Sequence, residues 1–245
     1  MPEAELNTPS IRDNDRGLDS AAMPNWWRVS VSLQGLWKGL AESDPRRACI
    51  DNLLYEHLSA KVRMEQSTWF ADVIQTLRLE KNVGGAVRRY FEAFVFLCRS
   101  ALDCEACFIN DLCQLGLSER VVDFGSVKKA LVSRHKYKKL LSALARETDN
   151  AKGTWFWHFN LLRNSDTHRT VSASAVVYCV GRIPEYCKHD KYFLLEDPRD
   201  RKSFGKNADF GVGAYTANVL AKTAAAIEAA EGVLADYLKK GTVAP

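Results

Sequence analysis

The sequence predicts a mainly α-helical protein, an antiparallel helical bundle with a small β-hairpin before its C-terminal helix. Apolar residues recur at spacings of three and four over several long stretches, the pattern of a helix with one buried face. The 245 residues include only 14 glycines and seven prolines, too few for the dense turns of an all-β fold. The composition is 47% hydrophobic and 10% aromatic, typical of a chain with a packed core. The length suits one domain or at most two.

The N-terminal third of the chain is expected to hold a tail and then helices. Residues 1–24 are polar and predict a loose tail, and residues 25–82 predict an N-terminal helical extension. Ser43-Asp44-Pro45 is typical of a helix start, because aspartate caps free backbone amides and proline suits the first turn. Residues 50–62 then carry apolar side chains at helical spacing. Residues 69–79 fit a helix or a strand equally well.

The main domain is expected over residues 83–240 and opens with the strongest helix of the sequence, after Gly84-Gly85. Its buried face is predicted to be one broad stripe: Val87, Phe91, Phe94, Cys98, Ala101, Leu102, Glu105, Phe108, Ile109 and Leu112. A second helix is expected over about residues 126–147. Lys152-Gly153 marks a break, and a third helix begins near Thr154.

The pattern changes after Thr170, where a β insertion is expected over about residues 171–212. Residues 176–180 and 192–195 are short runs rich in β-branched and aromatic side chains, which favours a β-hairpin. An alanine-rich helix over about residues 215–240 completes the predicted fold.

The formal net charge of +4 is too small to indicate a partner, but the positive charges are unevenly spread. Seven lysines or arginines and no acid lie between Lys128 and Arg146. Such a strip can follow a phosphate backbone, or it can be an ordinary solvated helix face. The candidate RNA-binding residues in it are Lys128, Lys129, Arg134, Lys136, Lys138 and Lys139.

Several features indicate a cytoplasmic protein without a metal site or cofactor. The first 25 residues carry acids and no apolar stretch that would direct export, and the longest apolar run, 93–98, is far too short to span a membrane. Seven cysteines, an odd number, then predict reduced thiols. Cys104 and Cys107 have the spacing of half a zinc site, but they fall inside a helix, which favours core packing. His57 and His158 lie beside apolar residues at helical spacing and are expected in the core or at its boundary.

The residues best suited to chemistry lie between Leu162 and Arg169. Asn164 and His168 are four positions apart on a predicted helix and therefore share one face, and the long Arg163 side chain can reach toward them. Arginine can hold two oxygens of a phosphate, and histidine transfers protons near neutral pH. This set suits a phosphodiester and needs no metal ion.

Arg163-Asn164 followed by three residues and His168 resembles the R-N-x-x-x-H form of the motif of HEPN domains (higher eukaryotes and prokaryotes nucleotide-binding). Residues 97–103, which include an R-S-A-L-D stretch, resemble the first core helix of several bacterial HEPN-like families. Residues 156–169 resemble their motif helix, and Asp197-Pro198 resembles the end of the strand pair that follows it. The resemblance covers roughly residues 83–240, and it implies a helical bundle of the HEPN-like type.

The resemblance also implies a function. Many HEPN members are metal-independent endoribonucleases of toxin, defence or RNA-processing systems, and they often form homodimers. In that role, His168 would transfer a proton at the ribose 2′-OH or the leaving 5′-oxygen, Arg163 would stabilise charge on phosphorus, and Asn164 would orient His168 or the phosphate. RNA is then the expected partner, and an antitoxin or another protein is a possible second partner.

Two alternatives stay open. Other HEPN-like members are catalytically inactive and bind a nucleotide, RNA or protein partner, and Arg163 and His168 would then be structural groups at a helix end. The site-supporting residues Arg99 and Asp103 have the spacing of an ion pair within one helix, or Asp103 faces the third helix and positions Arg163. Glu105 lies in the apolar stripe and is a second polar group that could face the site.

Overall fold

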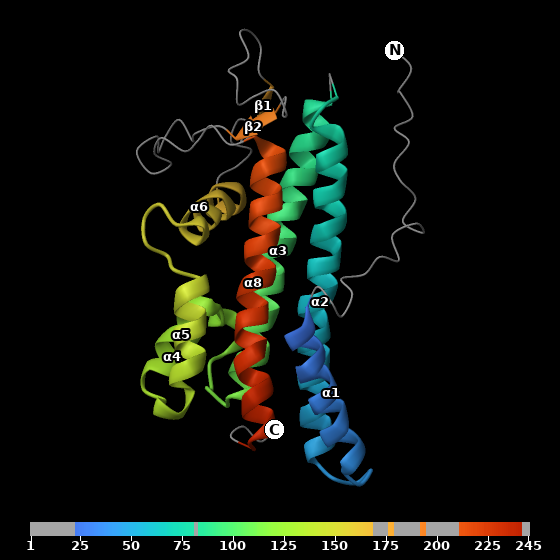
Figure 1. The fold of residues 1–245 in the computed structure, drawn as a ribbon, viewed down its shortest axis with the longest axis vertical. Helices are drawn as coiled ribbons and strands as arrows, with labels where there is room; N and C mark the ends of the chain where they lie inside the picture. The colour runs from blue at the N-terminus through green and yellow to red at the C-terminus, as the bar shows by residue number, and fades with distance from the viewer. Residues whose placement is uncertain (1–22, 81–82, 169–175, 179–191, 195–210, 242–245) are drawn as a thin grey trace.

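The computed structural model shows a mostly helical protein, in agreement with the fold class that the sequence predicts (Figure 1). The side chains of Leu161 and of residues 163–168 are not part of the description. The described residues are 23–80, 83–168, 176–178, 192–194 and 211–241.

Three long helices lie side by side along the longest axis of the molecule (Figure 1): α2 (Arg46–Leu77), α3 (Gly84–Leu112) and α8 (Val212–Lys239). α2 and α3 run in opposite directions and pack against each other over most of their length, and α8 runs in the same direction as α3. The side chain of Gln75 donates a hydrogen bond to the Gly213 carbonyl at 2.7 Å, which holds α2 at the start of α8.

The apolar stripe predicted for α3 is confirmed, because all ten of its members are buried. The ambiguous residues 69–79 fall almost entirely in α2. Their side chains Val73, Ile74 and Leu77 are buried in the core, so packing against the neighbouring helices decides in favour of a helix where local pattern did not.

α1 (Pro24–Gly39) packs against α2 and α8, and its first turn is capped by a residue from the other end of the chain. The preceding residue, Met23, makes no side-chain cap. Instead the Glu228 carboxylate of α8 accepts hydrogen bonds from the backbone amides of Asn25 and Trp26, both at 3.0 Å. Free amides and the helix dipole both favour an anion at this position.

The single helix expected over about residues 126–147 is wrong. The structure has two helices there, α4 (Phe124–Val132) and α5 (Lys138–Glu147), joined through a short 3₁₀ turn, His135–Tyr137. The chain turns here because Tyr137 is buried, and its hydroxyl donates a hydrogen bond to the Cys113 carbonyl at 3.3 Å. A second 3₁₀ turn, Glu119–Val121, precedes α4.

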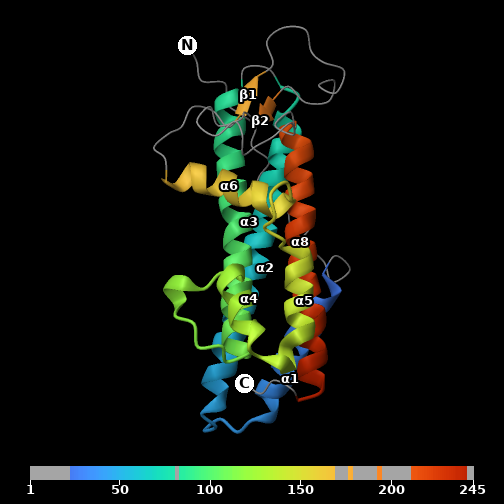
Figure 2. The same ribbon diagram turned by 90° about the vertical axis from the view of Figure 1, so that its left-hand side faces the viewer.

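α6 (Trp155–His168) crosses the long helices α3 and α8 at a steep angle (Figure 2). Gly153 stands before it with a φ of +92°, a conformation that only glycine adopts without strain, so the expected break falls at this turn. Phe156, Phe159 and Leu162 form the buried face of α6.

Two three-residue strands, β1 (Val176–Tyr178) and β2 (Tyr192–Leu194), pair antiparallel near the start of α8, with Val177 opposite Phe193 (Figure 2). The residues that would connect them, the expected Asp197-Pro198 feature and residues 1–22 of the expected N-terminal tail lie outside the described part of the chain. The last two residues of that tail are ordered, because Met23 is buried and Pro24 begins α1. Among the helices that are described, none combines the length and the hydrophobicity needed to cross a membrane.

We expect Glu228→Ala to lower the free energy of unfolding by about 1–2 kcal/mol, because two amides of α1 lose a charged acceptor. Chemical denaturation followed by circular dichroism measures this change. The exposed Glu42→Ala is the control and should change stability by less than about 0.5 kcal/mol. Equal stability of the two variants would contradict the capping role of Glu228.

Candidate nucleic-acid interface and motif helix

The predicted catalytic residues Arg163, Asn164 and His168 all fall within α6, whose last residue is His168. The helical backbone that the motif requires is therefore present. The side chains of all three lie outside the described residues, so their convergence on one site stays a prediction.

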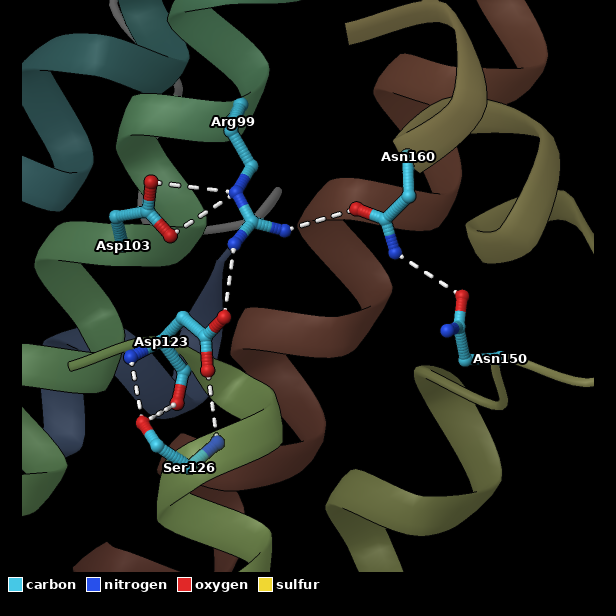
Figure 3. A network of polar contacts seen from close by, with 6 residues as sticks. All are labelled: Arg99, Asp103, Asp123, Ser126, Asn150 and Asn160. Atoms are coloured by element: carbon cyan, nitrogen blue, oxygen red, sulfur yellow. Dashed lines mark hydrogen bonds and ion pairs between the residues drawn. The ribbon is translucent and has the colours of Figure 1, made fainter. Parts of the chain in front are cut away.

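The side chain of Arg99 forms a polar network that reaches from α3 to α6 (Figure 3). Its Nε lies 3.0 Å from the nearer carboxylate oxygen of Asp103, one turn further along α3. One terminal nitrogen donates to the side-chain oxygen of Asn160 on α6 at 2.9 Å, and the other lies 3.5 Å from the Asp123 carboxylate. Asn160 in turn donates to the side chain of Asn150 at 3.1 Å. The Arg99 side chain is only 11% exposed, whereas the Asp103 and Asp123 side chains are 35% and 44% exposed, so the network is shielded at the guanidinium and reaches solvent at its edges.

This network joins the two segments that carry the resemblance. The ion pair between Arg99 and Asp103 within one helix is confirmed, and Arg99 also contacts the motif helix. Asn160 comes one helical turn before Arg163 and Asn164, so the network anchors the turn that leads into the motif. Sequence reasoning missed Asn160. The signal was present, since it is the one amide between the aromatic residues of this helix and Asn164.

Asp123 is a second residue that sequence reasoning missed. Its side chain accepts a hydrogen bond from the backbone amide of Ser126 at 2.7 Å, and the Ser126 hydroxyl accepts one from the Asp123 amide, which together form a capping box at the start of α4. Burial tends to raise the pKa of the Asp123 carboxyl, but the hydrogen bonds from Ser126 and the charge of Arg99 outweigh it, and the pKa is lowered. Asp123 is therefore an anion that balances Arg99.

Part of the basic strip lines a groove of about 770 Å³ between α5 and the end of α8. The basic residues that line it are His135, Lys136, Lys138, Lys139, Arg146 and Lys240. The first five are exposed, and Asp236 is the single acid among the groove-lining residues. This part of the expected strip is thus a concave positive surface, to which Lys240, directly after α8, adds a further cation.

Lys128 differs from the rest of the predicted strip. Its ammonium donates to the carbonyl of Thr148 at 2.7 Å and to the hydroxyl of the same residue at 3.1 Å. Burial lowers the pKa of Lys128, although Asp149 and Asp123 oppose the shift. This side chain holds the end of α5 against α4 and is not available to a phosphate. Lys129 and Arg134 are exposed, but neither lines the groove.

Glu105, expected as a second polar group near the motif, is instead at the centre of the bundle. It is fully buried together with His57 of α2 and Glu231 of α8. Burial raises the pKa values of the Glu105 and Glu231 carboxyl groups well above the usual range, and repulsion from Glu231 adds to the shift at Glu105. Burial lowers the pKa of His57 to about 4, so its imidazole is neutral near pH 7. The expectation that His57 lies in the core is confirmed.

The remaining candidates are structural. Cys104 and Cys107 are free thiols within α3 that are only partly buried, so they lie at the boundary of the core and not inside it as expected. Burial raises the pKa of Cys107 to about 11. Within the described residues, no potential metal-binding group contains a cysteine. The indole of Trp155 donates to the Glu147 carbonyl at 2.8 Å, and Phe156 is buried, so these aromatic residues fix α6 to its surroundings. Burial lowers the pKa of the half-buried His158.

Comparison of the chain with known protein families, with curated proteins and with solved structures gives no match.

We expect Arg99→Ala to lower the free energy of unfolding by about 1–3 kcal/mol, because it removes hydrogen bonds to two carboxylates and to Asn160. Urea denaturation measures the loss. Arg146→Ala is the matched control, since Arg146 is 72% exposed and pairs with its neighbour Glu147, and we expect a change below about 0.5 kcal/mol. A loss no larger than that of the control would mean that the network does not hold α6 in place.

Proposed function

We propose that this chain is a metal-independent endoribonuclease of the HEPN type. The observation that carries the proposal is the Arg99 network, because it joins the R-S-A-L-D segment of α3 to the helix that bears Arg163, Asn164 and His168. The two segments resemble HEPN sequences independently, and their contact is what a common origin in that fold requires. The function therefore rests on the sequence resemblance together with this contact.

The proposed chemistry uses the RNA's own 2′-OH as the nucleophile. His168 removes the proton of the 2′-OH or protonates the leaving 5′-oxygen, Arg163 stabilises the charge that develops on phosphorus, and Asn164 orients His168 or the phosphate. One motif supplies one imidazole, whereas the reaction needs a proton acceptor and a proton donor. We therefore propose a homodimer in which two copies of α6 form one cleft, and a cytoplasmic location with RNA as the partner.

The alternative is an inactive HEPN-like module that binds RNA, a nucleotide or a protein. The basic groove favours it, because concave positive surfaces bind polyanions with or without cleavage. The two functions differ in a simple way. A binding module holds RNA through the groove and leaves it intact, whereas the enzyme cuts it.

For the enzyme, we expect His168→Ala to slow RNA cleavage about 10²–10⁴-fold, since it removes proton transfer. Arg163→Ala should give a loss of about 10²–10³-fold through lost charge stabilisation. Cleavage is measured with labelled RNA without added magnesium. Ser165→Ala, inside the same stretch but outside the motif pattern, is the control and should retain full activity. Wild-type protein that binds RNA without cutting it would favour the inactive module. Equal cleavage rates for all variants would show that Arg163 and His168 are not the catalytic residues.

For the groove, we expect the double variant Lys138→Gln, Lys139→Gln to weaken RNA binding and to lower the slope of log K against log salt by about 1–2, because each phosphate contact releases a counterion. Fluorescence anisotropy at several salt concentrations measures both quantities. Lys38→Gln with Lys222→Gln makes the same charge change at two exposed lysines outside the groove. Equal losses for both double variants would mean that net charge, and not the groove, attracts RNA.

A further inference from the structure

The three long helices each contribute one metal-ligating side chain to the same buried point. These are His57 of α2, Glu105 of α3 and Glu231 of α8, each no more than 1% exposed. One donor atom from each lies within 4.8 Å of the other two, and the Nδ1 of His57 is 2.9 Å from a carboxylate oxygen of Glu231. Donor atoms that share a zinc ion at about 2.0–2.2 Å lie roughly 3–3.5 Å apart. The separation of His57 and Glu231 is close to that spacing, and Glu105 lies within 4.8 Å of both.

The carboxyl groups of this cluster have no partner outside it. Among the described residues, no group beyond the cluster donates a hydrogen bond to Glu105 or Glu231, whose polar contacts are each other and the Nδ1 of His57. A buried polar atom without a partner costs about 1–3 kcal/mol, and more when it is charged. Since the two carboxyl groups face each other, only a proton or a cation placed between them would remove this cost.

The imidazole of His57 is oriented as a metal ligand would be. Its Nε2 lies 3.2 Å from the carbonyl oxygen of Trp26, which fixes the proton on Nε2 and leaves the lone pair of Nδ1 directed at Glu231. Histidine ligands in proteins usually hold their second nitrogen in this way. The ring of Trp26 stacks on the imidazole with centroids 4.3 Å apart, and the centroid of the tilted Phe108 ring lies 4.9 Å from that of the imidazole. The imidazole is therefore fixed in orientation before any ion binds.

Charge and ligand chemistry both favour a divalent cation. When a cation displaces their protons, the two carboxylates carry a charge of −2, which a divalent ion neutralises in a region without other buried cations among the described residues. One nitrogen and two oxygen donors suit Zn²⁺, Mn²⁺ or Fe²⁺ better than the soft ions that prefer thiolates. α1 covers the cluster through Trp26, whose indole also donates to the His57 carbonyl at 3.3 Å.

We propose that His57, Glu105 and Glu231 bind one divalent transition-metal ion, which joins α2, α3 and α8 at the centre of the bundle. The ion is structural. It lies in the core, apart from the motif helix and the basic groove, and it takes no part in the RNA chemistry. Because α1 seals the site, the ion enters as the chain folds and exchanges slowly afterwards.

The test is to unfold the full chain in guanidinium with a chelator, refold it with Zn²⁺ or with chelator alone, and measure bound metal and melting temperature. We expect about one zinc per chain and a melting temperature several degrees higher than that of the metal-free protein. Refolding with Co²⁺ should give the visible absorption of a low-symmetry site without the near-ultraviolet thiolate band. That spectrum excludes ligation by Cys104 and Cys107.

Two variants complete the design. Glu231→Gln should bind less than a tenth of an equivalent of zinc, whereas Glu228→Gln, one turn earlier on α8 and occupied by the amides of α1, should bind zinc as wild type does. If Glu231→Gln fails to fold, the cobalt spectrum and zinc content of the wild type decide. Wild-type protein that refolds to the same stability without bound metal would overturn the proposal, since protonated carboxyl groups would then account for the cluster. A thiolate band with cobalt would overturn it as well.

Discussion

Burial of two carboxyl groups and an imidazole between α2, α3 and α8 is the constraint on which the rest of this structure depends. Apolar side chains can slide past one another, but His57, Glu105 and Glu231 must meet within a few ångströms or each is left alone in the core. The cluster therefore sets the register of the three long helices. α1 adds to this, because its first turn contacts both His57 and the neighbouring Glu228.

The register of α3 in turn places the motif helix. Arg99 lies on α3, between the start of that helix and the buried Glu105. Its guanidinium binds Asn160 of α6 and Asp123, which caps the start of α4. An arginine suits this role because its planar group keeps several fixed hydrogen bonds at once. Arg99 thus adds a polar link between the structural core and the segment proposed to cut RNA, beside the apolar packing of Phe156, Phe159 and Leu162. The basic groove lies between α5 and the end of α8, where it can bind substrate without disturbing that link.

Local pattern predicted what depends on one helix at a time. The stripe of α3 and the pair of Arg99 with Asp103 follow from spacings of three and four residues, and the break at Gly153 follows from the glycine itself. Local pattern failed where contacts between segments distant in sequence determine the structure. The break between α4 and α5 follows from the burial of Tyr137 against Cys113, and neither the capping of α1 by Glu228 nor the meeting of residues 57, 105 and 231 has any local signal.

The central claim is that RNA is cut by attack of its own 2′-OH at the Arg163, Asn164 and His168 motif. It is tested most directly by the chemical ends of the cleaved RNA, determined by mass spectrometry of the products. The account predicts a 2′,3′-cyclic phosphate or 3′-phosphate on one fragment and a free 5′-hydroxyl on the other, with no cleavage of the same sequence as DNA. Fragments that carry a 5′-phosphate and form only when magnesium is added would contradict it.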